Sequence, residues 1–237
     1  MPSESSWGTP ESAPRRGSFR EEHALADGTR VTLRFIRPDD AAEMRRSFAR
    51  LSPRSRYQRF LAGVPELTDE MLAYLTQVDG ENHVAIVATT DSLDLKSEVG
   101  LGVARFVRLA DDPHIAEAAV TVLDDVQGKG VGRLLLRALA GLALTRGVRA
   151  FRGEVLAENA RMRHLLDEVG ATSHVADKHT LVFEVPLCGP AEAVGKEASH
   201  PLRRLLRAAA ESLRMVPHPG APAAEEIRDT LRRGYGT

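Results

Sequence analysis

The chain has 237 residues, of which 43% are hydrophobic and 27% are charged, enough for one large domain or one ordinary domain with extensions. The formal net charge of -1 offers no overall positive field for nucleic acid or an acidic membrane surface, and an aromatic share of 5% disfavours a stacking platform for single strands. The single cysteine, Cys188, excludes an intramolecular disulfide and a multi-cysteine metal site, and we interpret it as structural or incidental.

The first 18 residues are predicted to form a disordered tail, because they carry too little apolar surface to offset the entropy of ordering. The segment is polar and contains no apolar run, so it does not resemble a secretory signal. The sequence also lacks any run of about 18 apolar residues, the length that a spanning helix needs. We therefore expect a cytoplasmic protein with no membrane partner.

A domain is predicted over residues 19–187. Its first strand is indicated by Val31, Leu33 and Phe35 alternating with polar residues. The strand at 29–36 is followed by three predicted helices: one from 38 to about 50, a short one from 52 with Tyr57, Phe60 and Leu61 on one side, and one from 68. Strands are then predicted at 84–88 and 99–109, joined by a hairpin loop at 91–97, and at 115–123. The last elements are a helix from about 130 to 146, a strand at 150–156, a helix at 159–169 and a strand at 180–185.

This order predicts an α/β (α+β) fold, in which a mixed and largely antiparallel twisted sheet is flanked by helices, with a crossover at a glycine-rich turn. Residues 188–237 are predicted to form a C-terminal helical extension, with an amphipathic helix at 201–215 and a short helix at 223–233. Packing on the domain is the preferred role for its leucine stripe. Pairing of two chains as a homodimer and contact with another partner are the alternatives.

The strand at 115–123 leads into a turn with three glycines in five residues, and a helix follows at once. The turn is Gln127-Gly128-Lys129-Gly130-Val131-Gly132. Glycine permits positive φ and close backbone approach, and a helix N-terminus adds unpaired N–H donors, so the turn suits a pyrophosphate. Lys129 and Arg133 could add positive charge there. A ligand-free structural turn is the alternative. The spacing fits neither the Walker A pattern nor the dinucleotide fingerprint.

The pattern Gln127-x-x-Gly130-x-Gly132 resembles the Gln/Arg-x-x-Gly-x-Gly/Ala signature of the GNAT superfamily of acyl-CoA N-acyltransferases. The similarity extends over residues 29–186, and the segments 36–40 and 154–170 resemble two further family motifs. The stretch 51–79 is similar to the GNAT domain of bacterial protein lysine acetyltransferases. The resemblance implies that acetyl-CoA is the co-substrate, that the backbone of residues 127–133 cradles its pyrophosphate, and that the acceptor is an amine, preferably a protein lysine.

The resemblance also implies roles for individual residues. Glu117 matches the glutamate that serves as general base, and its small apolar neighbours would raise its pKa. The backbone N–H near Val122 would bind the thioester carbonyl, and Val122 and Leu123 would pair with pantetheine. Asn159 would bind the pantetheine arm, cap the helix that follows it, or do both.

One position departs from the family. Leu166 stands where many members have a tyrosine that protonates the leaving thiolate, so that proton would come from water or another group. Two alternatives therefore stay open besides a protein lysine acetyltransferase: a small-amine acetyltransferase and a non-catalytic acetyl-CoA sensor. The histidines at 83, 114, 174 and 179 lack the spacing of metal ligands, so no metal is expected.

Overall fold

The computed structural model describes residues 19–60, 64–91, 97–168 and 170–187. The predicted tail at 1–18, positions 92–96 of the predicted hairpin loop at 91–97, Cys188 and the predicted C-terminal helices lie outside these residues. Within them, eight strands form one sheet in the order β1-β2-β3-β4-β5-β6-β8-β7. The strands are β1 (Arg20–Ala24), β2 (Arg30–Phe35), β3 (His83–Asp91), β4 (Glu98–Arg108), β5 (Ile115–Val122), β6 (Ala150–Leu156), β7 (Thr172–Val175) and β8 (Thr180–Pro186).

The sheet is antiparallel except between β5 and β6, which pair in parallel. A parallel pair needs a crossover connection, and helix α4 (Val131–Leu144) supplies it. The predicted fold class, a mixed and largely antiparallel sheet with helices on its faces, is confirmed. Two short edge strands, β1 and β7, were not predicted; each forms by pairing with a longer neighbour, β2 and β8 respectively.

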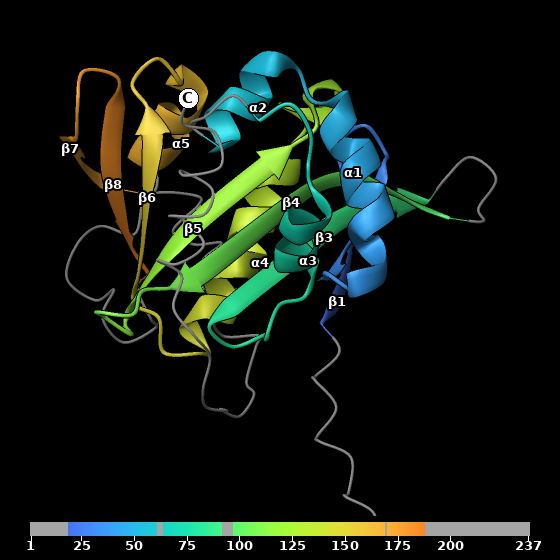
Figure 1. Cartoon of the computed structure of the whole chain (residues 1–237), viewed down its shortest axis with the longest axis horizontal. Helices are drawn as coiled ribbons and strands as arrows, with labels where there is room; N and C mark the ends of the chain where they lie inside the picture. Colours follow the sequence, from blue (N-terminus) through green and yellow to red (C-terminus); the bar gives the residue numbers. More distant parts are fainter. Residues whose placement is uncertain (1–18, 61–63, 92–96, 169, 188–237) are drawn as a thin grey trace, which may run out of the picture.

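Helix α4 covers one face of the sheet and buries a continuous stripe against β3, β4 and β5 (Figure 1). Leu135 and Leu139 are fully buried there beside Ile86 and Phe106 of the sheet. The alternation of apolar residues along the strands supplies the sheet side of this core. The stripe on α4 has the helical period that the sequence showed, and the core fixes where the amino end of α4 lies.

The opposite face carries α1 (Ala41–Arg50), α2 (Pro53–Phe60) and α3 (Asp69–Thr76) (Figure 1). A short 3₁₀ turn, η1 (Pro38–Asp40), leads into α1. Thr68 caps α3 by accepting a hydrogen bond of 3.2 Å from the Met71 N–H, as the predicted helix start at Thr68 requires. Tyr57 of α2 is 48% exposed, so the apolar side expected for this helix does not include it. Helix α5 (Ala160–Glu168) follows β6.

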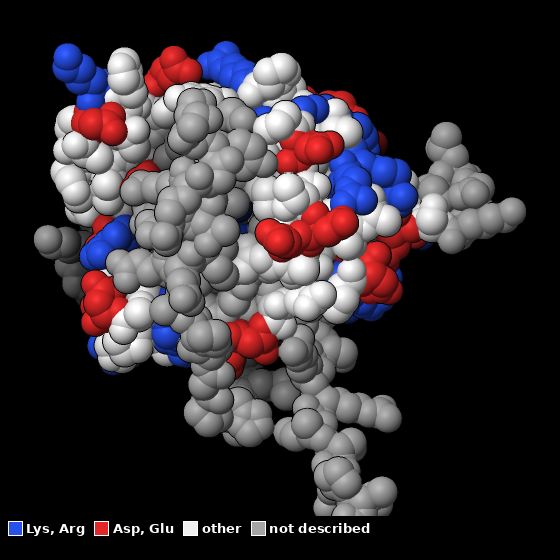
Figure 2. Space-filling view, in the orientation of Figure 1, with Lys and Arg blue, Asp and Glu red and all other residues white. Residues whose placement is uncertain are grey.

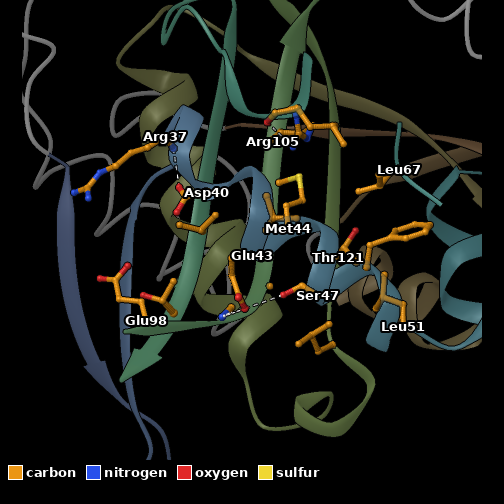
Figure 3. A pocket seen from close by; sticks show the side chains of 18 of the residues that line it. Arg37, Asp40, Glu43, Met44, Ser47, Leu51, Leu67, Glu98, Arg105 and Thr121 are labelled. Carbon is orange, nitrogen blue, oxygen red and sulfur yellow. Dashed lines mark hydrogen bonds between the residues drawn. The ribbon is translucent and has the colours of Figure 1, made fainter. Parts of the chain in front are cut away.

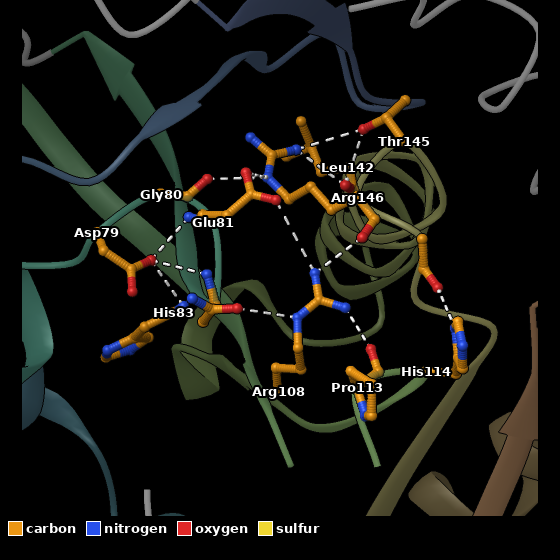
Figure 4. Close-up of polar contacts among 12 residues, drawn as sticks. Asp79, Gly80, Glu81, His83, Arg108, Pro113, His114, Leu142, Thr145 and Arg146 are labelled. Atoms are coloured by element: carbon orange, nitrogen blue, oxygen red, sulfur yellow. Dashed lines mark hydrogen bonds and ion pairs between the residues drawn. The ribbon is translucent and has the colours of Figure 1, made fainter. Parts of the chain in front are cut away.

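A polar network closes the end of the sheet where β3 begins and β4 ends (Figure 4). Asp79 accepts hydrogen bonds from three successive backbone N–H groups, those of residues 81 to 83. Arg108 donates to the Arg146 carbonyl at 2.8 Å and to the Pro113 carbonyl, and Arg146 donates to the Gly80 carbonyl at 2.8 Å. Glu81 lies within 4.0 Å of both guanidinium groups. These contacts tie the carboxyl end of α4 to the sheet.

Candidate active site

Strands β5 and β6 part beside the glycine turn. Pairing of β5 with β4 covers seven positions, from Ala116 to Val122. Pairing with β6 covers three positions and stops at Glu117 opposite Arg152. Beyond that pair the two strands diverge (Figure 1), and no residue of β5 after Glu117 pairs with a described strand on that edge, although the Ala118 carbonyl still lies near Gly153 of β6. We call this unpaired stretch of the β5 edge, up to Val122, the opening.

The backbone of β5 is oriented so that some of its polar groups point into this opening. The Leu123 N–H donates to the Leu101 carbonyl on β4 at 3.0 Å. Because successive residues of a strand direct their backbone groups to opposite edges, those of Val120 and Val122 point toward β6. The Val122 carbonyl accepts a hydrogen bond from Gln127 Nε2 at 3.1 Å. The N–H groups of Val120 and Val122 are thus aimed where a carbonyl or amide ligand could enter.

The glycine turn has the backbone that its sequence predicts. Gly128 and Gly130 have φ values of 82° and 98°, in the left-handed region that favours glycine. Gly130 is the N-cap of α4 and supplies no capping side chain. The first N–H groups of a helix have no partner within it, so those of Val131 and Gly132 can bind an anion at this end. Val131 itself is buried, with 1% exposure, and anchors the turn.

The polar side chains of the turn engage other protein groups. Gln127 Oε1 accepts a hydrogen bond from Arg161 of α5 at 2.8 Å, so Gln127 links the end of β5 to α5. Lys129 Nζ lies 3.2 Å from Asp27 in the turn between β1 and β2. Arg133 is exposed on the first turn of α4. The anion-binding capacity of the turn therefore comes first from its backbone.

Glu117 is exposed and occupies the last paired position of β5 before the opening. Its expected enclosure among small apolar neighbours is not what the structure shows, because residues alternate between the two faces of a strand. Its buried neighbour Ala116 faces α4, whereas Glu117 faces the side that carries α1 to α3. Arg59 of α2 and Tyr74 of α3 lie close enough to feel its charge.

Asn159 caps α5, since its Oδ1 accepts a hydrogen bond from the Met162 N–H at 3.2 Å. This is one of the two roles expected for it. Leu166, at the position of the family's tyrosine, is 9% exposed and belongs to the main core. It offers no proton donor to the opening.

The junction between β5 and the glycine turn is held by residues that the sequence analysis did not single out. Asp124 accepts hydrogen bonds from the Ser52 N–H at 2.9 Å, Ser52 Oγ at 3.2 Å and Ser55 Oγ at 2.6 Å. Burial opposes ionisation of Asp124, but the hydrogen bonds from Ser55 and Ser52 outweigh it and lower its pKa. Arg50 and Asp125 form an ion pair of 2.8 Å. The corner between α1 and α2 is thereby fastened to the turn.

A cavity of about 440 Å³ lies between the α1 to α3 layer and the sheet. Figure 3 shows Glu98 near one end and Arg105 near the other, with Met44 and Ser47 between them. Near the Glu98 end, Arg34 bridges Asp40 at 2.7 Å and Glu98 at 2.6 Å. Hydrogen bonding to Asp40 raises the pKa of Arg34, although burial opposes it. This guanidinium is fully compensated by carboxylates of the chain.

The other end of the cavity, lined by Arg59, Arg105 and Thr121, has a different electrostatic character. Arg105 is 5% exposed and donates to the Leu75 carbonyl at 3.2 Å and to His83 Nε2 at 3.1 Å. Since arginine cannot accept, His83 is the acceptor and therefore neutral. Burial, and to a smaller extent the charge of Arg59, lower the pKa of Arg105 to about 9. Among the described residues, no Asp or Glu forms an ion pair with Arg105.

The described residues contain no group of three or more His, Cys, Asp or Glu side chains that could hold a metal ion. None of the described helices is both long and apolar enough to span a membrane. On the face drawn in Figure 2, acidic and basic side chains of the described surface are interspersed, with no continuous field of one sign.

Comparison with known proteins connects this geometry to a family. The family model described as an acetyltransferase (GNAT) domain matches residues 30–172. Acetyltransferase Pat of Mycolicibacterium smegmatis is 35% identical over 153 residues, which are 65% of this chain and 44% of that protein. Acetyltransferase PA5475 of Pseudomonas aeruginosa is 33% identical over 147 residues, 62% of this chain and 77% of that protein. The chain thus spans less than half the length of the first of these relatives.

A solved structure gives the same result. The GNAT domain of S. lividans PAT superposes with a TM-score of 0.65 and 28% identity, covering 71% of this chain and 97% of that domain.

Proposed function

This chain belongs to the GNAT acetyltransferase family, and from that premise we propose that it transfers the acetyl group of acetyl-CoA to a primary amine, with a protein lysine as the preferred acceptor. Membership makes it an acyl-CoA-dependent acetyltransferase. The acceptor, the catalytic base and the site of acetyl-CoA are our proposals. The similarity of residues 51–79 to bacterial protein lysine acetyltransferases supports the choice of a lysine.

The observation that carries the proposal is the opening between β5 and β6 next to a helix N-terminus. The N–H groups at the start of α4 would hold the pyrophosphate of acetyl-CoA, with Gly130 leaving the approach open. The pantetheine arm is an extended chain with amide groups, and it would pair with the free edge of β5 at Val120 and Val122. The residues present therefore fit this co-substrate.

Bound acetyl-CoA supplies the thioester that the amine attacks. The amine nitrogen would form a bond to the carbonyl carbon, and the carbon–sulfur bond would then break. A backbone N–H near Val122 would donate to the carbonyl oxygen as negative charge develops on it. These steps need no covalent intermediate on the protein.

Glu117 would accept the proton that the amine must lose. A lysine amine has a pKa of about 10.4 in solution, so it is protonated near neutral pH and needs a base or a water relay. Glu117 is exposed at the mouth of the opening, where an acceptor amine and water can both reach it. With Leu166 buried in the core, the leaving thiolate would take its proton from water.

The same position of Leu166 favours a second candidate, a module that binds acetyl-CoA without turnover, because the family's proton donor is replaced by a core residue. The two candidates differ in whether a thiol is released.

The deciding experiment measures thiol release from acetyl-CoA against a panel of lysine peptides and small amines, for the native chain and Glu117→Gln. We expect the variant to lose about 10²- to 10⁴-fold in kcat/KM while calorimetry shows unchanged acetyl-CoA binding. Glu66→Gln is the matched control, since Glu66 is an exposed acid in the loop before α3. Tight acetyl-CoA binding without turnover on any amine would establish the sensor instead. A Glu117→Gln variant as active as the native chain would remove the base assignment alone.

A further inference from the structure

The cavity end near Glu117 holds a buried cation, Arg105, that no acid of the described residues pairs with. Arg105 is buried, with 5% exposure, yet its hydrogen bonds go to a neutral imidazole and a backbone carbonyl. Burying an unpaired charge costs several kcal/mol, so such groups are found paired or at sites that bind a counter-ion. Arg105 lines the cavity, which gives a ligand access to it.

Strand register places this cation on the same face as the proposed base. Arg105 of β4 lies directly opposite Ala119 of β5, and residues directly opposite in an antiparallel pair share a face. Ala119 and Glu117 are two residues apart, so they also share that face. Arg105 and Glu117 are therefore diagonal neighbours across the two strands, separated by roughly 7–8 Å at their Cβ atoms.

A second arginine joins them from the helical layer. Helix α2 packs against β5 and carries Arg59, which lines the same cavity. The charge of Arg59 interacts with both Glu117 and Arg105. Its guanidinium group lies 4.9 Å from the centre of the Phe60 ring. Arg59 thus adds a second guanidinium group near both the proposed base and the buried cation.

The charges of the described residues that face this end do not balance. Among them, two guanidinium groups stand against one carboxylate, that of Glu117, while His83 is neutral and burial raises the pKa of Tyr74, which stays a phenol. Asp79, an acid near His83, accepts hydrogen bonds from three backbone N–H groups and forms no ion pair with Arg105. The excess is one positive charge, which matches a carboxylate better than a phosphate of nearly two negative charges.

We propose that Arg105 and Arg59 form an acceptor subsite that binds a carboxylate carried by the amine substrate, beside Glu117. The inference rests on the proposed function and narrows its substrate class. The carboxylate is either the side chain of an acidic residue next to the acetylated lysine or the carboxylate of a free amino acid. A guanidinium fork binds either one through paired N–H···O bonds. The subsite holds the acceptor's charge while its amine faces Glu117.

The test compares acceptors that differ only in this charge. Lysine peptides carry Glu or Gln at the two positions on either side of the lysine, and a free ω-amino acid is compared with its carboxamide. The native chain should prefer the carboxylate by about 10- to 100-fold in kcat/KM, chiefly through KM. The arm that shows the larger preference identifies the source of the carboxylate.

The arginine variants decide whether the subsite is responsible. Arg105→Gln should bring the preference to within about threefold of unity, and Arg59→Gln, a change at a half-buried position that leaves the core intact, should reduce it about tenfold. Arg54→Gln is the matched control, because Arg54 is an exposed arginine of the same helix and should keep the full preference. Equal use of both acceptors by the native chain, or a preference that survives both variants, would overturn the inference.

Failure of the proposed acetyltransferase function can be told apart from failure of the carboxylate subsite. If no amine is acetylated, calorimetry with the acetyl-lysine peptides decides the subsite by itself. Tighter binding of the Glu form, lost in Arg105→Gln, would uphold the carboxylate subsite in a non-catalytic module. Equal binding of the Glu and Gln forms would refute it.

Discussion

Each end of the cavity contains a buried arginine, and the two arginines differ in whether carboxylates pair with them. Arg34 and Arg105 are each 5% exposed. Arg34 is held by Asp40 and Glu98, and its pKa is raised, whereas burial and Arg59 lower the pKa of Arg105 to about 9. Equal burial therefore does not give the two guanidinium groups equal pKa values. The difference depends on whether the fold brings carboxylates to the guanidinium.

Two arginines at the end of the sheet where β4 ends also lie near an acid, although burial lowers the pKa of Arg146. Arg108 and Arg146 both lie within 4.0 Å of Glu81, as Figure 4 shows. At these three arginines the chain supplies an acid, whereas Arg56 is held by the carbonyls of Leu51, Pro65 and Ala49. At Arg105 the chain supplies none among its described residues, and this end lies beside the opening of β5. Arg34 is therefore a cation that stabilises the fold, whereas Arg105 is available to a ligand.

Removal of the compensated arginine should have the largest effect. Arg34→Met removes the buried guanidinium from the carboxylates of Asp40 and Glu98, and leaves Glu98 with only one described cation, the exposed Arg20 at 3.6 Å. We expect the free energy of unfolding to fall by about 3–5 kcal/mol, measured by urea denaturation at neutral pH. Arg30→Met on the same strand is the control, since Arg30 is 80% exposed and its pair with Asp91 should contribute less than about 1 kcal/mol. Similar losses in both variants would contradict the distinction between buried and exposed pairs.

Lowering the pH should reduce the stability of the fold, because His83, which contacts Arg105, becomes protonated more readily in the unfolded chain. Burial lowers the pKa of His83 to about 4, from an unfolded value of about 6.5. Between these values the unfolded chain binds the proton and the folded chain does not, so stability is present above pH 6.5 and is lost as the pH falls toward 4. The loss should reach about 2 kcal/mol.

The measurement is urea unfolding at pH 7 and pH 4.5 for the native chain and His83→Gln. Glutamine keeps an acceptor for Arg105 but cannot be protonated in this range. The variant should show a pH dependence smaller by about 2 kcal/mol, and an unchanged dependence would refute the assignment. His164→Gln, an exposed position on α5, controls for histidine titration in general.

Replacing Arg105 should change the free energy of unfolding in the opposite direction from replacing Arg34, or leave it unchanged. Arg105→Met removes an uncompensated buried charge and keeps most of the volume, at the loss of the bond to the Leu75 carbonyl. The free energy of unfolding should stay level or rise by up to about 2 kcal/mol, while the preference for a carboxylate-bearing acceptor disappears. Destabilisation as large as that of Arg34→Met would make Arg105 a structural cation and end the comparison.

The sequence predicted what depends on local pattern. The mixed sheet, the glycine turn before α4 and the strand carrying Glu117 follow from alternation, helical period and glycine chemistry, and the structure has the strand, the turn and the helix in that order. The edge strand β1 was missed because Arg20–Ala24 shows little apolar alternation and exists by pairing with β2.

The two arginines show why the site was less predictable than the fold. Arg34 stands between Leu33 and Phe35, and Arg105 between Ala104 and Phe106, so their local sequences are nearly equivalent. Asp40 lies only six residues after Arg34, but the other partners lie far along the chain: Glu98 reaches Arg34 from β4, and His83 reaches Arg105 from β3. Asp124 is a similar case, since its serine partners lie about 70 positions away. No spacing rule could have found these contacts.

The smallest expected effect comes from giving Arg105 the acid that Arg34 already has. Ala119 lies directly opposite Arg105, so Ala119→Glu places a carboxylate within reach of the guanidinium. An opposite-charge cross-strand pair contributes about 0.2–1 kcal/mol, and repulsion from Glu117 on the same face reduces it, so stability should rise by less than about 1 kcal/mol.

The effect of Ala119→Glu on acceptor preference should be larger than its effect on stability, because an internal carboxylate would compete with that of the acceptor. Kinetics with the paired Glu and Gln peptides should show the preference lost in Ala119→Glu and kept in Ala119→Gln, which has the same size without the charge. If both variants lose it equally, the added volume blocks the subsite and the charge of Arg105 is not what selects the acceptor; if only Ala119→Glu does, the uncompensated cation is the selecting element.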